Sequence, residues 1–289
     1  MVRPAAKRQA VTHLTEKLGI SQRRACRLVD IKRSVLVYEP KPKDDHIILQ
    51  RIREVLRDSP RYGCPRVHIM LRRMGIAINH KRTARIYRSN KLQLKYRKRK
   101  RRVKQPENPL PPPTYPNQVW TMDFVHDALF DGRKIRILTL VDELTRECLA
   151  LECDTSISSE RVVRVLKDVA STRRFPLEIG VDHGPEFTSK IMEKFAYEKN
   201  IRLRFAQPGN KNENAFIESF NGKLRDECLN MAWFTSLSDA RENLRIWRLV
   251  YNELRPHTSL GGMTPKEFKE SLKPKVVWSC PGFLSHSKL

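Results

Sequence analysis

The chain has 289 residues and a formal net charge of +25, and its positive charge is unevenly distributed. Residues 1–105 contain 31 Lys or Arg against 7 acidic residues, a net of +24, so the first part favours a polyanionic partner, with nucleic acid as the first candidate. The apolar runs are too short to span a bilayer and the N-terminus has no apolar signal core, which excludes a membrane-spanning class and predicts a cytoplasmic protein without a membrane partner.

Residues 8–31 predict two helices around a turn, within a segment that we place at residues 1–40. Gly19 ends the first helix and Ser21 can cap the second. Two interpretations stay open. The segment is either a helix-turn-helix whose second helix binds the major groove of DNA or a small amphipathic hairpin with solvated arginines. The candidate DNA contacts are Arg23, Arg24 and Arg27.

Residues 41–104 predict a second basic helical region. Pro65 and Gly75 are placed at the start and the end of one helix, and Asn79 can cap the next. A basic tail follows; such a tail is most often solvated and disordered, but after two basic helical segments it favours an arm that follows DNA phosphates. The candidate DNA contacts share a positive side chain and are Lys81, Arg82, Arg85, Arg88, Lys98, Arg99, Lys100 and Arg101.

A proline-rich linker at residues 105–117 separates this region from an α/β region at residues 118–270, with a tail at residues 271–289. The predicted order in the α/β region is three antiparallel strands, then helix, strand, helix, strand and two helices. One of these helices is expected to begin at Pro185, and the last two near Asn214 and Ser238. This order is typical of an RNase H-like fold, a mixed five-stranded sheet with flanking helices behind an all-α DNA-binding region.

Three acidic residues of the α/β region stand where a lone carboxylate is unfavourable. Asp123 interrupts an apolar strand, Asp182 ends another, and Glu218 lies between apolar residues of a helix. Fifty-eight residues separate the first pair and 35 the second. Three converging acids would raise each other's pKa unless a cation holds them ionised, and oxygen ligands suit Mg²⁺. Each acid alone is also compatible with a local structural role, but together they predict a divalent-metal site of the phosphoryl-transfer type.

The helix around Glu218 carries further polar residues that suit a DNA backbone approaching a metal. We expect Phe216, Phe220 and Leu224 to form its apolar stripe. His183, next to Asp182, is an auxiliary candidate for the metal or the scissile phosphate, although local bonding in a turn is its commoner role. The scattered cysteines and histidines form no zinc-type array. The candidate DNA contacts on the helix are Asn214, Asn221, Lys223 and Arg225.

These blocks together resemble a known family. W-T-M-D-F, V-D-H-G-P-E-F-T-S and E-N-A-F-I-E-S-F-N-G-K-L-R-D-E-C-L-N resemble the catalytic blocks of DDE transposases and retroviral-type integrases. The similarity is closest to the second-reading-frame transposase of the "insertion sequence three" family. The segment Y-N-E-L-R-P-H-T-S-L-G resembles the C-terminal signature of that family. The resemblance implies that Asp123, Asp182 and Glu218 are catalytic metal ligands for Mg²⁺ or Mn²⁺, with two ions.

The resemblance also implies an activity and partners. A polynucleotidyl transferase of this kind cuts one strand at each transposon end and joins the new 3′ hydroxyl to target DNA, in transposition, DNA integration and recombination. Its expected partners are double-stranded DNA with terminal inverted repeats, target DNA, further copies of itself and an upstream-frame product, on the bacterial nucleoid. Two alternatives stay open, a metal-dependent nuclease of the same fold and a catalytically silent DNA-binding regulator of transposition.

Overall fold

The structure is a computed structural model, and it describes residues 4–38, 44–94, 111–206 and 215–272. The chain forms two compact units, Met1–Ile48 and Leu49–Leu289. The finer division into segments 1–40, 41–104, 105–117, 118–270 and 271–289 stays a prediction. None of the described helices is both long enough and apolar enough to cross a membrane.

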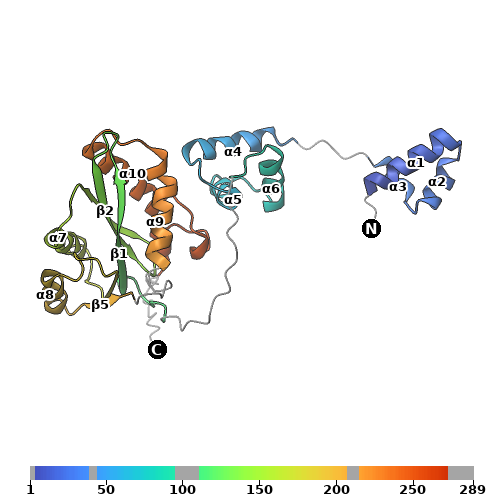
Figure 1. Cartoon of the computed structure of the whole chain (residues 1–289). Helices are drawn as coiled ribbons and strands as arrows, with labels where there is room; N and C mark the ends of the chain where they lie inside the picture. The colour runs from blue at the N-terminus through green and yellow to red at the C-terminus, as the bar shows by residue number, and fades with distance from the viewer. Residues whose placement is uncertain (1–3, 39–43, 95–110, 207–214, 273–289) are drawn as a thin grey trace, which may run out of the picture. The chain divides into compact units, whose positions relative to one another are not determined.

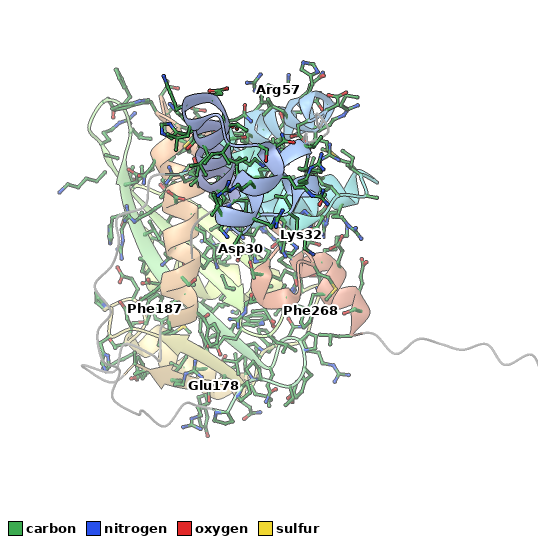
Figure 2. All side chains as sticks on the ribbon, turned by 90° about the vertical axis from the view of Figure 1, so that its right-hand side faces the viewer. Asp30, Lys32, Arg57, Glu178, Phe187 and Phe268 are labelled. Atoms are coloured by element: carbon green, nitrogen blue, oxygen red, sulfur yellow. The ribbon has the colours of Figure 1, made fainter. Side chains whose placement is uncertain are left out.

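The first unit consists of three short helices. They are α1 (Pro4–Leu18), α2 (Gln22–Leu28) and α3 (Arg33–Val37), and Asp30 and Lys32 lie in the turn before α3 (Figure 2). The predicted pair of helices with Gly19 at the turn is confirmed, since Gly19 has a φ of +57 that suits glycine. The sequence did not indicate α3. Val11, Ala25 and Cys26 form the small core of this unit.

The second unit begins with a helical part. It contains most of α4 (His46–Asp58), in whose first turn the boundary between the units falls, and α5 (Cys64–Arg73) and α6 (His80–Ser89); the inner faces of these helices bury Ile52, Val67, Leu71 and Ile86. The Asn79 side chain accepts a hydrogen bond from the Lys81 backbone N–H at 2.9 Å, so the predicted cap of α6 is confirmed. Helix α4 was not predicted, although its apolar residues recur at helical spacing.

A mixed five-stranded sheet follows, with the order β3-β2-β1-β4-β5. Strands β1 (Val119–Ala128), β2 (Lys134–Asp142) and β3 (Cys148–Asp154) pair antiparallel, while β4 (Glu178–Val181) and β5 (Arg202–Phe205) extend the sheet in parallel with β1. The predicted order of elements and the RNase H-like fold are therefore confirmed.

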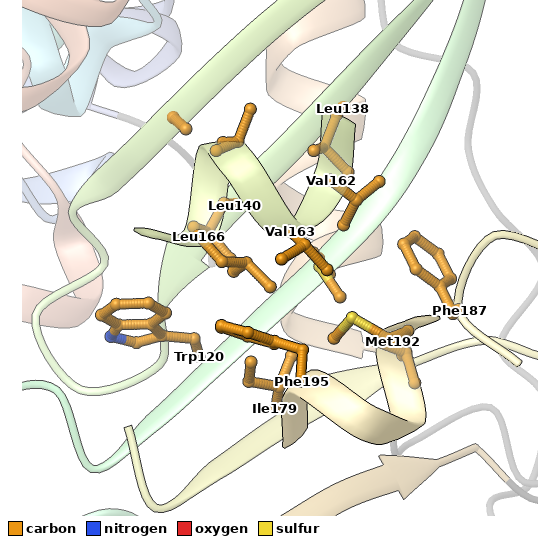
Figure 3. Packing of buried hydrophobic residues seen from close by; sticks show 14 of the residues in the cluster. Trp120, Leu138, Leu140, Val162, Val163, Leu166, Ile179, Phe187, Met192 and Phe195 are labelled. Atoms are coloured by element: carbon orange, nitrogen blue, oxygen red, sulfur yellow. The ribbon is translucent and has the colours of Figure 1, made fainter. Parts of the chain in front are cut away.

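Helices cover both faces of the sheet (Figure 1). Helices α7 (Ser159–Ala170) and α8 (Lys190–Glu198) pack on one face, where Trp120, Ile179 and Phe195 are buried together (Figure 3). Helices α9 (Ala215–Glu227) and α10 (Leu237–Glu253) cover the other face. Because side chains alternate along a strand, Thr121, Asp123 and Val125 all point toward the α9 face.

Two expectations about the helices are wrong. Helix α8 begins at Lys190 with Ser189 as its cap, not at Pro185, because the residues between form a turn whose side chains pack against the sheet. On α9, Phe216 is 39% exposed, whereas Ile217, Phe220 and Leu224 form the buried stripe. The fold also adds short turns η1 (Leu229–Met231) and η2 (Thr258–Leu260), and helix α11 (Pro265–Ser271).

Candidate active site

The pairing of β1 with β4 brings Asp123 and Asp182 to the same place on the sheet. The two strands are parallel, and Val119 pairs with Glu178, Trp120 with Ile179 and Thr121 with Gly180. Continuing this register by two residues sets Asp182, the residue after β4, alongside Asp123. The residues between the two acids form β2, β3, α7 (Ser159–Ala170) and β4, and the pairing of β4 with β1 brings the acids together.

Asp123 is held by hydrogen bonds from three directions. Its Oδ1 accepts from the Phe124 backbone N–H at 2.7 Å, and its Oδ2 accepts from Asn221 Nδ2 at 2.8 Å. The Thr139 hydroxyl, directly across the β1–β2 pair, lies 3.0 Å from both the Asp123 carbonyl oxygen and Asn221 Oδ1. Asn221 is only 9% exposed, and its contact with DNA stays a prediction. Its amide fixes the orientation of the Asp123 carboxylate.

The charges around Asp123 resemble those expected of a metal site. The pKa of Asp123 is raised from 3.8 to about 6, chiefly by burial and also by the negative charges of Asp182 and Glu218, while its hydrogen bonds from Phe124 and Asn221 act in the opposite direction. The three acids are therefore electrostatic neighbours. In the part of the chain that the structure describes, no three His, Cys, Asp or Glu side chains lie close enough together to hold a metal ion.

The donor chemistry of this trio nonetheless fits a hard divalent cation. Two aspartates and a glutamate offer carboxylate oxygens only, which are the ligands that Mg²⁺ and Mn²⁺ prefer. Because burial, together with the charges of Asp182 and Glu218, makes Asp123 costly to ionise, a cation at this place would stabilise the ionised form. An outer hydrogen bond such as that of Asn221 is also typical of ligating carboxylates. The ligand roles of these acids stay a proposal.

The turn after Asp182 is fixed to β1 and β2. Asp182 Oδ1 accepts from the Gly184 backbone N–H at 2.9 Å, and a Cβ on Gly184 would meet that oxygen at 3.0 Å, so glycine suits this position. Phe187 stacks on Phe124 with ring centroids 5.1 Å apart. Glu186 pairs with Arg136 of β2, whose guanidinium lies 4.2 Å from the Phe124 ring centroid. These contacts restrain the loop that carries Asp182.

His183 and Glu218 differ in their surroundings. The ring of the exposed His183 lies 5.4 Å from that of Phe205, a local contact that leaves its auxiliary role a prediction. Glu218 lies in the first turn of α9, exposed on the same face as Arg225, which donates to the His126 carbonyl oxygen at 3.0 Å. Lys223 is half-buried on another face of α9.

The remaining predicted DNA contacts divide into two groups. Arg23, Arg24 and Arg27 of α2 are exposed, as are Lys81, Arg85 and Arg88 of α6, while Arg82 is half-buried. Their contact with DNA stays a prediction. The others lie outside the described residues; they are Lys98, Arg99, Lys100, Arg101 and Asn214.

Ion pairs that the sequence did not reveal connect α9 to the helical part of the same unit. Arg61 pairs with Asp226, and Arg66 Nη1 donates to Glu227 Oε1 at 3.0 Å. Glu227 also accepts two bonds of 2.6 Å from Arg255, which is 2% exposed. Arg61 and Arg66 thus contact the helix that carries Glu218. The positive charge of these arginines alone does not predict that they form ion pairs with α9.

Comparison with known proteins identifies the family. Residues 113–211 and 199–265 each match a model described as an integrase core domain, and residues 42–100 match an HTH-like domain. A 31.7 kDa protein of insertion element IS407 from Burkholderia multivorans is 43% identical over 256 residues, covering 88% of this chain and 92% of its own. The chain belongs to the integrase-core family of insertion-element transposases.

Further relatives agree with this family. The transposase InsD for insertion element IS2D of Escherichia coli is 27% identical over 237 residues, covering 78% of this chain and 79% of its own. The simian T-cell lymphotropic virus intasome in complex with PP2A regulatory subunit B56 gamma contains a chain of the same fold. Its TM-score is 0.51 at 16% identity, over 82% of this chain and 80% of that one. Family membership places the transposase in the polynucleotidyl transferase class, and its HTH-like domain makes it a DNA-binding protein.

Proposed function

We propose that this transposase cleaves one DNA strand at each end of an insertion sequence and joins the freed 3′ hydroxyl to target DNA. The observation that carries the proposal is the setting of Asp123. It is partly buried on β1, bonded to Asn221, and under the charges of Asp182 and Glu218. Membership of the integrase-core family supports the same reaction class.

Each residue has a stated task in this proposal. Asp123, Asp182 and Glu218 would hold two Mg²⁺ or Mn²⁺ ions, and Asn221 keeps the Asp123 carboxylate oriented. When bound, the ions lower the pKa of the attacking oxygen and stabilise the leaving oxygen. The restrained turn after Asp182 would keep its carboxylate beside β1, where Asp123 lies, when the substrate binds. Phosphoryl transfer of this kind needs positioning and charge, and no covalent enzyme intermediate.

We infer the partners from the same reaction. The DNA substrates are the terminal inverted repeats and a target duplex, bound through the basic helices. Joining two ends requires more than one copy of the chain on the DNA, and an upstream-frame product would complete end recognition. The reaction would take place at the bacterial nucleoid.

The test is a joining assay with labelled end DNA and target DNA, with and without Mg²⁺. The variants Asp123→Asn, Asp182→Asn and Glu218→Gln should each lose cleavage and joining by at least about a thousandfold, because each removes a metal-binding charge. Their affinity for end DNA should stay within about threefold of the parent, because the basic helices are intact. Asp131→Asn, in an exposed hairpin turn, is the matched control and should keep full activity.

Three other outcomes would each contradict a part of this proposal. If all three variants lost DNA binding, the acids would have a structural role. If the parent cut DNA with Mg²⁺ but never joined a 3′ end to target, it would be a nuclease. If Mg²⁺ left the substrate uncut while binding persisted, the chain would be a regulator with a silent core.

A further inference from the structure

The turn between β2 and β3 carries an arginine in an unusual backbone conformation. Arg146 has a φ of +62, a left-handed conformation that costs free energy for a residue with a Cβ. Asp142, which is 1% exposed, fixes this turn, because its Oδ1 accepts from the Thr145 backbone N–H at 2.7 Å and from the Thr145 hydroxyl at 2.8 Å. A strained residue that its surroundings keep in place is typical of functional positions.

The same turn is bonded to the strands that carry or precede the two aspartates of the acidic trio. The Glu143 backbone N–H donates to the Val119 carbonyl oxygen of β1 at 3.0 Å. The Glu143 carboxylate, in a residue that is 5% exposed, accepts from Arg204 Nη2 at 2.6 Å. Arg204 Nη1 in turn donates to Glu178 Oε1 of β4 at 2.6 Å. The turn, and Arg146 with it, therefore has a fixed place relative to β1 and β4.

From this turn, the Arg146 side chain reaches the first turn of α9. Its Cζ lies 3.9 Å from the Phe216 ring centroid, the shortest such cation–π distance among the described residues. Within the part of the chain that the structure describes, its guanidinium forms no hydrogen bond or ion pair. Burial lowers the pKa of Arg146, with Glu143 acting in the opposite direction, and a cation–π contact is stronger where water is partly removed. The contact also accounts for Phe216, which is 39% exposed and lies outside the buried stripe of α9.

Phe216 lies two residues before Glu218 in the first turn of α9. Two residues span about 200° around an α-helix, so the ring and the carboxylate are on nearly opposite sides of this turn. The first turn is also the least bonded part of a helix, since its N–H groups have no partner within the helix. A side-chain contact at Phe216 therefore restrains the rotation of the turn and, with it, the direction of the Glu218 side chain.

We propose that Arg146 is a positioning residue for Glu218. Its guanidinium holds the Phe216 ring, so that the turn bonded to β1 and β4 sets the first turn of α9 relative to the two aspartates. Arg146 contacts neither DNA nor metal in this role. The proposal rests on the proposed function, in which Glu218 is a metal ligand. It predicts that loss of Arg146 weakens metal binding and leaves DNA binding intact.

The first measurement is amide hydrogen exchange in EDTA without DNA, so that neither metal nor chemistry enters. In α9 the Ser219 and Phe220 N–H groups bond the carbonyls of the first two helical residues, so their exchange reports opening of the first turn. In Arg146→Gln and in Phe216→Leu both groups should exchange about fivefold faster, the factor for losing one cation–π contact. Exchange at Leu224, further along α9, should not change.

The second measurement is the Mg²⁺ dissociation constant, obtained without DNA from the rise of the melting temperature with Mg²⁺ concentration. It should increase about threefold in both variants, because apparent affinity falls with the fraction of molecules in the binding orientation. Loss of a positive charge alone would favour Mg²⁺ binding, so weaker binding in Arg146→Gln separates positioning from electrostatics. Affinity for end DNA should stay within about twofold of the parent in Phe216→Leu, which changes no charge.

Two control variants accompany these measurements. Phe216→Tyr keeps an aromatic ring below the guanidinium and should behave as the parent does. Lys199→Gln removes a cation that lies 5.6 Å from the Phe175 ring centroid, away from α9. It is the matched control for loss of a cation–π contact and should change neither amide exchange in α9 nor the Mg²⁺ dissociation constant.

Two further variants separate positioning from general stability. Arg146→Gly relieves the left-handed backbone, so its melting temperature without metal should not fall, while its Mg²⁺ dissociation constant should rise as in Arg146→Gln. The double variant Arg146→Gln with Phe216→Leu should show no larger rise than either single variant, because both changes break the same contact.

Two results would overturn the positioning role. One is an unchanged Mg²⁺ dissociation constant in Arg146→Gln, whatever the amide exchange. The other is a double variant in which the two effects add. A parent that shows all the expected exchange and Mg²⁺ results but never joins ends to target DNA would instead refute the proposed chemistry and leave the positioning of Glu218 by Arg146 intact.

Discussion

At the scale of single residues, Asp123 is a partly buried acid of the candidate active site that lowers the stability of the folded protein. Its carboxyl group has a pKa raised to about 6, chiefly by burial. Between pH 4 and 6 the folded protein thus binds more protons than the unfolded chain, and stability falls as pH rises through that window. The difference from the ordinary value of 3.8 corresponds to about 3 kcal/mol at neutral pH. The site keeps an acid that the fold alone would disfavour.

Replacing this acid should therefore stabilise the metal-free protein. At pH 7 we expect Asp123→Asn to unfold with a free energy higher by up to about 3 kcal/mol, and at pH 3.5 the advantage should vanish because the parent carboxyl is then protonated. Urea unfolding in EDTA at the two pH values measures this. Added Mg²⁺ should raise the melting temperature of the parent and not that of the variant, because binding to the folded state alone stabilises it.

The control for this experiment is Asp131, a carboxyl group whose pKa is lowered rather than raised. Hydrogen bonds from Arg133 lower the pKa of Asp131, so Asp131→Asn should give no gain at pH 7. An Asp123→Asn variant that is less stable than the parent at pH 7 would contradict the raised pKa. A Mg²⁺ response that survives in the variant would argue against Asp123 as a ligand.

At the scale of elements, the segment between β4 and α8 forms a turn rather than the start of a helix, and contacts with β1 and β2 hold this turn in place. Phe187 stacks on Phe124, and Glu186 bonds Arg136, whose side chain is 24% exposed. The hydrogen bond from Arg136 lowers the pKa of Glu186, with burial opposing it. Its contribution to stability is therefore present above its ordinary pKa of 4.5 and is lost as pH falls through the lower folded value.

Glu186→Gln should weaken this turn without touching the acids. We expect a loss of about 1–2 kcal/mol at pH 7, because the Arg136 guanidinium stays half-buried without its charged partner. The gap should narrow toward pH 3, and the joining rate should fall about tenfold at unchanged DNA affinity. Urea unfolding and the joining assay measure both effects, with the exposed Glu193→Gln on α8 as control. Full joining activity in Glu186→Gln would show that the turn does not need this pair.

The elements also show what the sequence could and could not predict. The strands, α9 and the Asn79 cap followed from local apolar spacing and from residue types with strong positional preferences. The start of α8 did not, because Glu186 and Phe187 have partners on β1 and β2 that no local pattern encodes. The bonds of Asn221 to Thr139 and Asp123 could not be predicted for the same reason, since only the fold brings these residues together.

At the scale of the whole molecule, the helical part and the core of the second unit share charged contacts. Arg61 with Asp226, Arg66 with Glu227 and Arg73 with Glu267 connect residues more than 160 positions apart. Arg61 and Asp226 are 38% and 37% exposed, so solvent screens their attraction and the pair contributes little by itself. Because its two members lie in different parts of the unit, substitutions of this pair can report whether the helical part contacts α9.

A charge-exchange cycle tests whether this contact exists in solution. Arg61→Asp and Asp226→Arg should each destabilise the protein by about 0.5–1 kcal/mol, because each places like charges together. The double variant should regain most of that loss, and high salt should reduce all three effects. Urea unfolding measures the cycle. Strictly additive losses would mean that the two side chains do not meet.

The ladder between β1 and β4 has a consequence for how such proteins can vary in length. Asp123 and Asp182 stay neighbours because backbone bonds fix which residues lie opposite each other, not because a set number of residues intervenes. Insertions or deletions at the hairpin tip or in the connection before β4 would leave the arrangement of these two acids untouched. A slip of one position in the pairing would instead turn one carboxylate to the opposite side of the sheet. Natural length variation should therefore collect in those connections and stop at the paired strands.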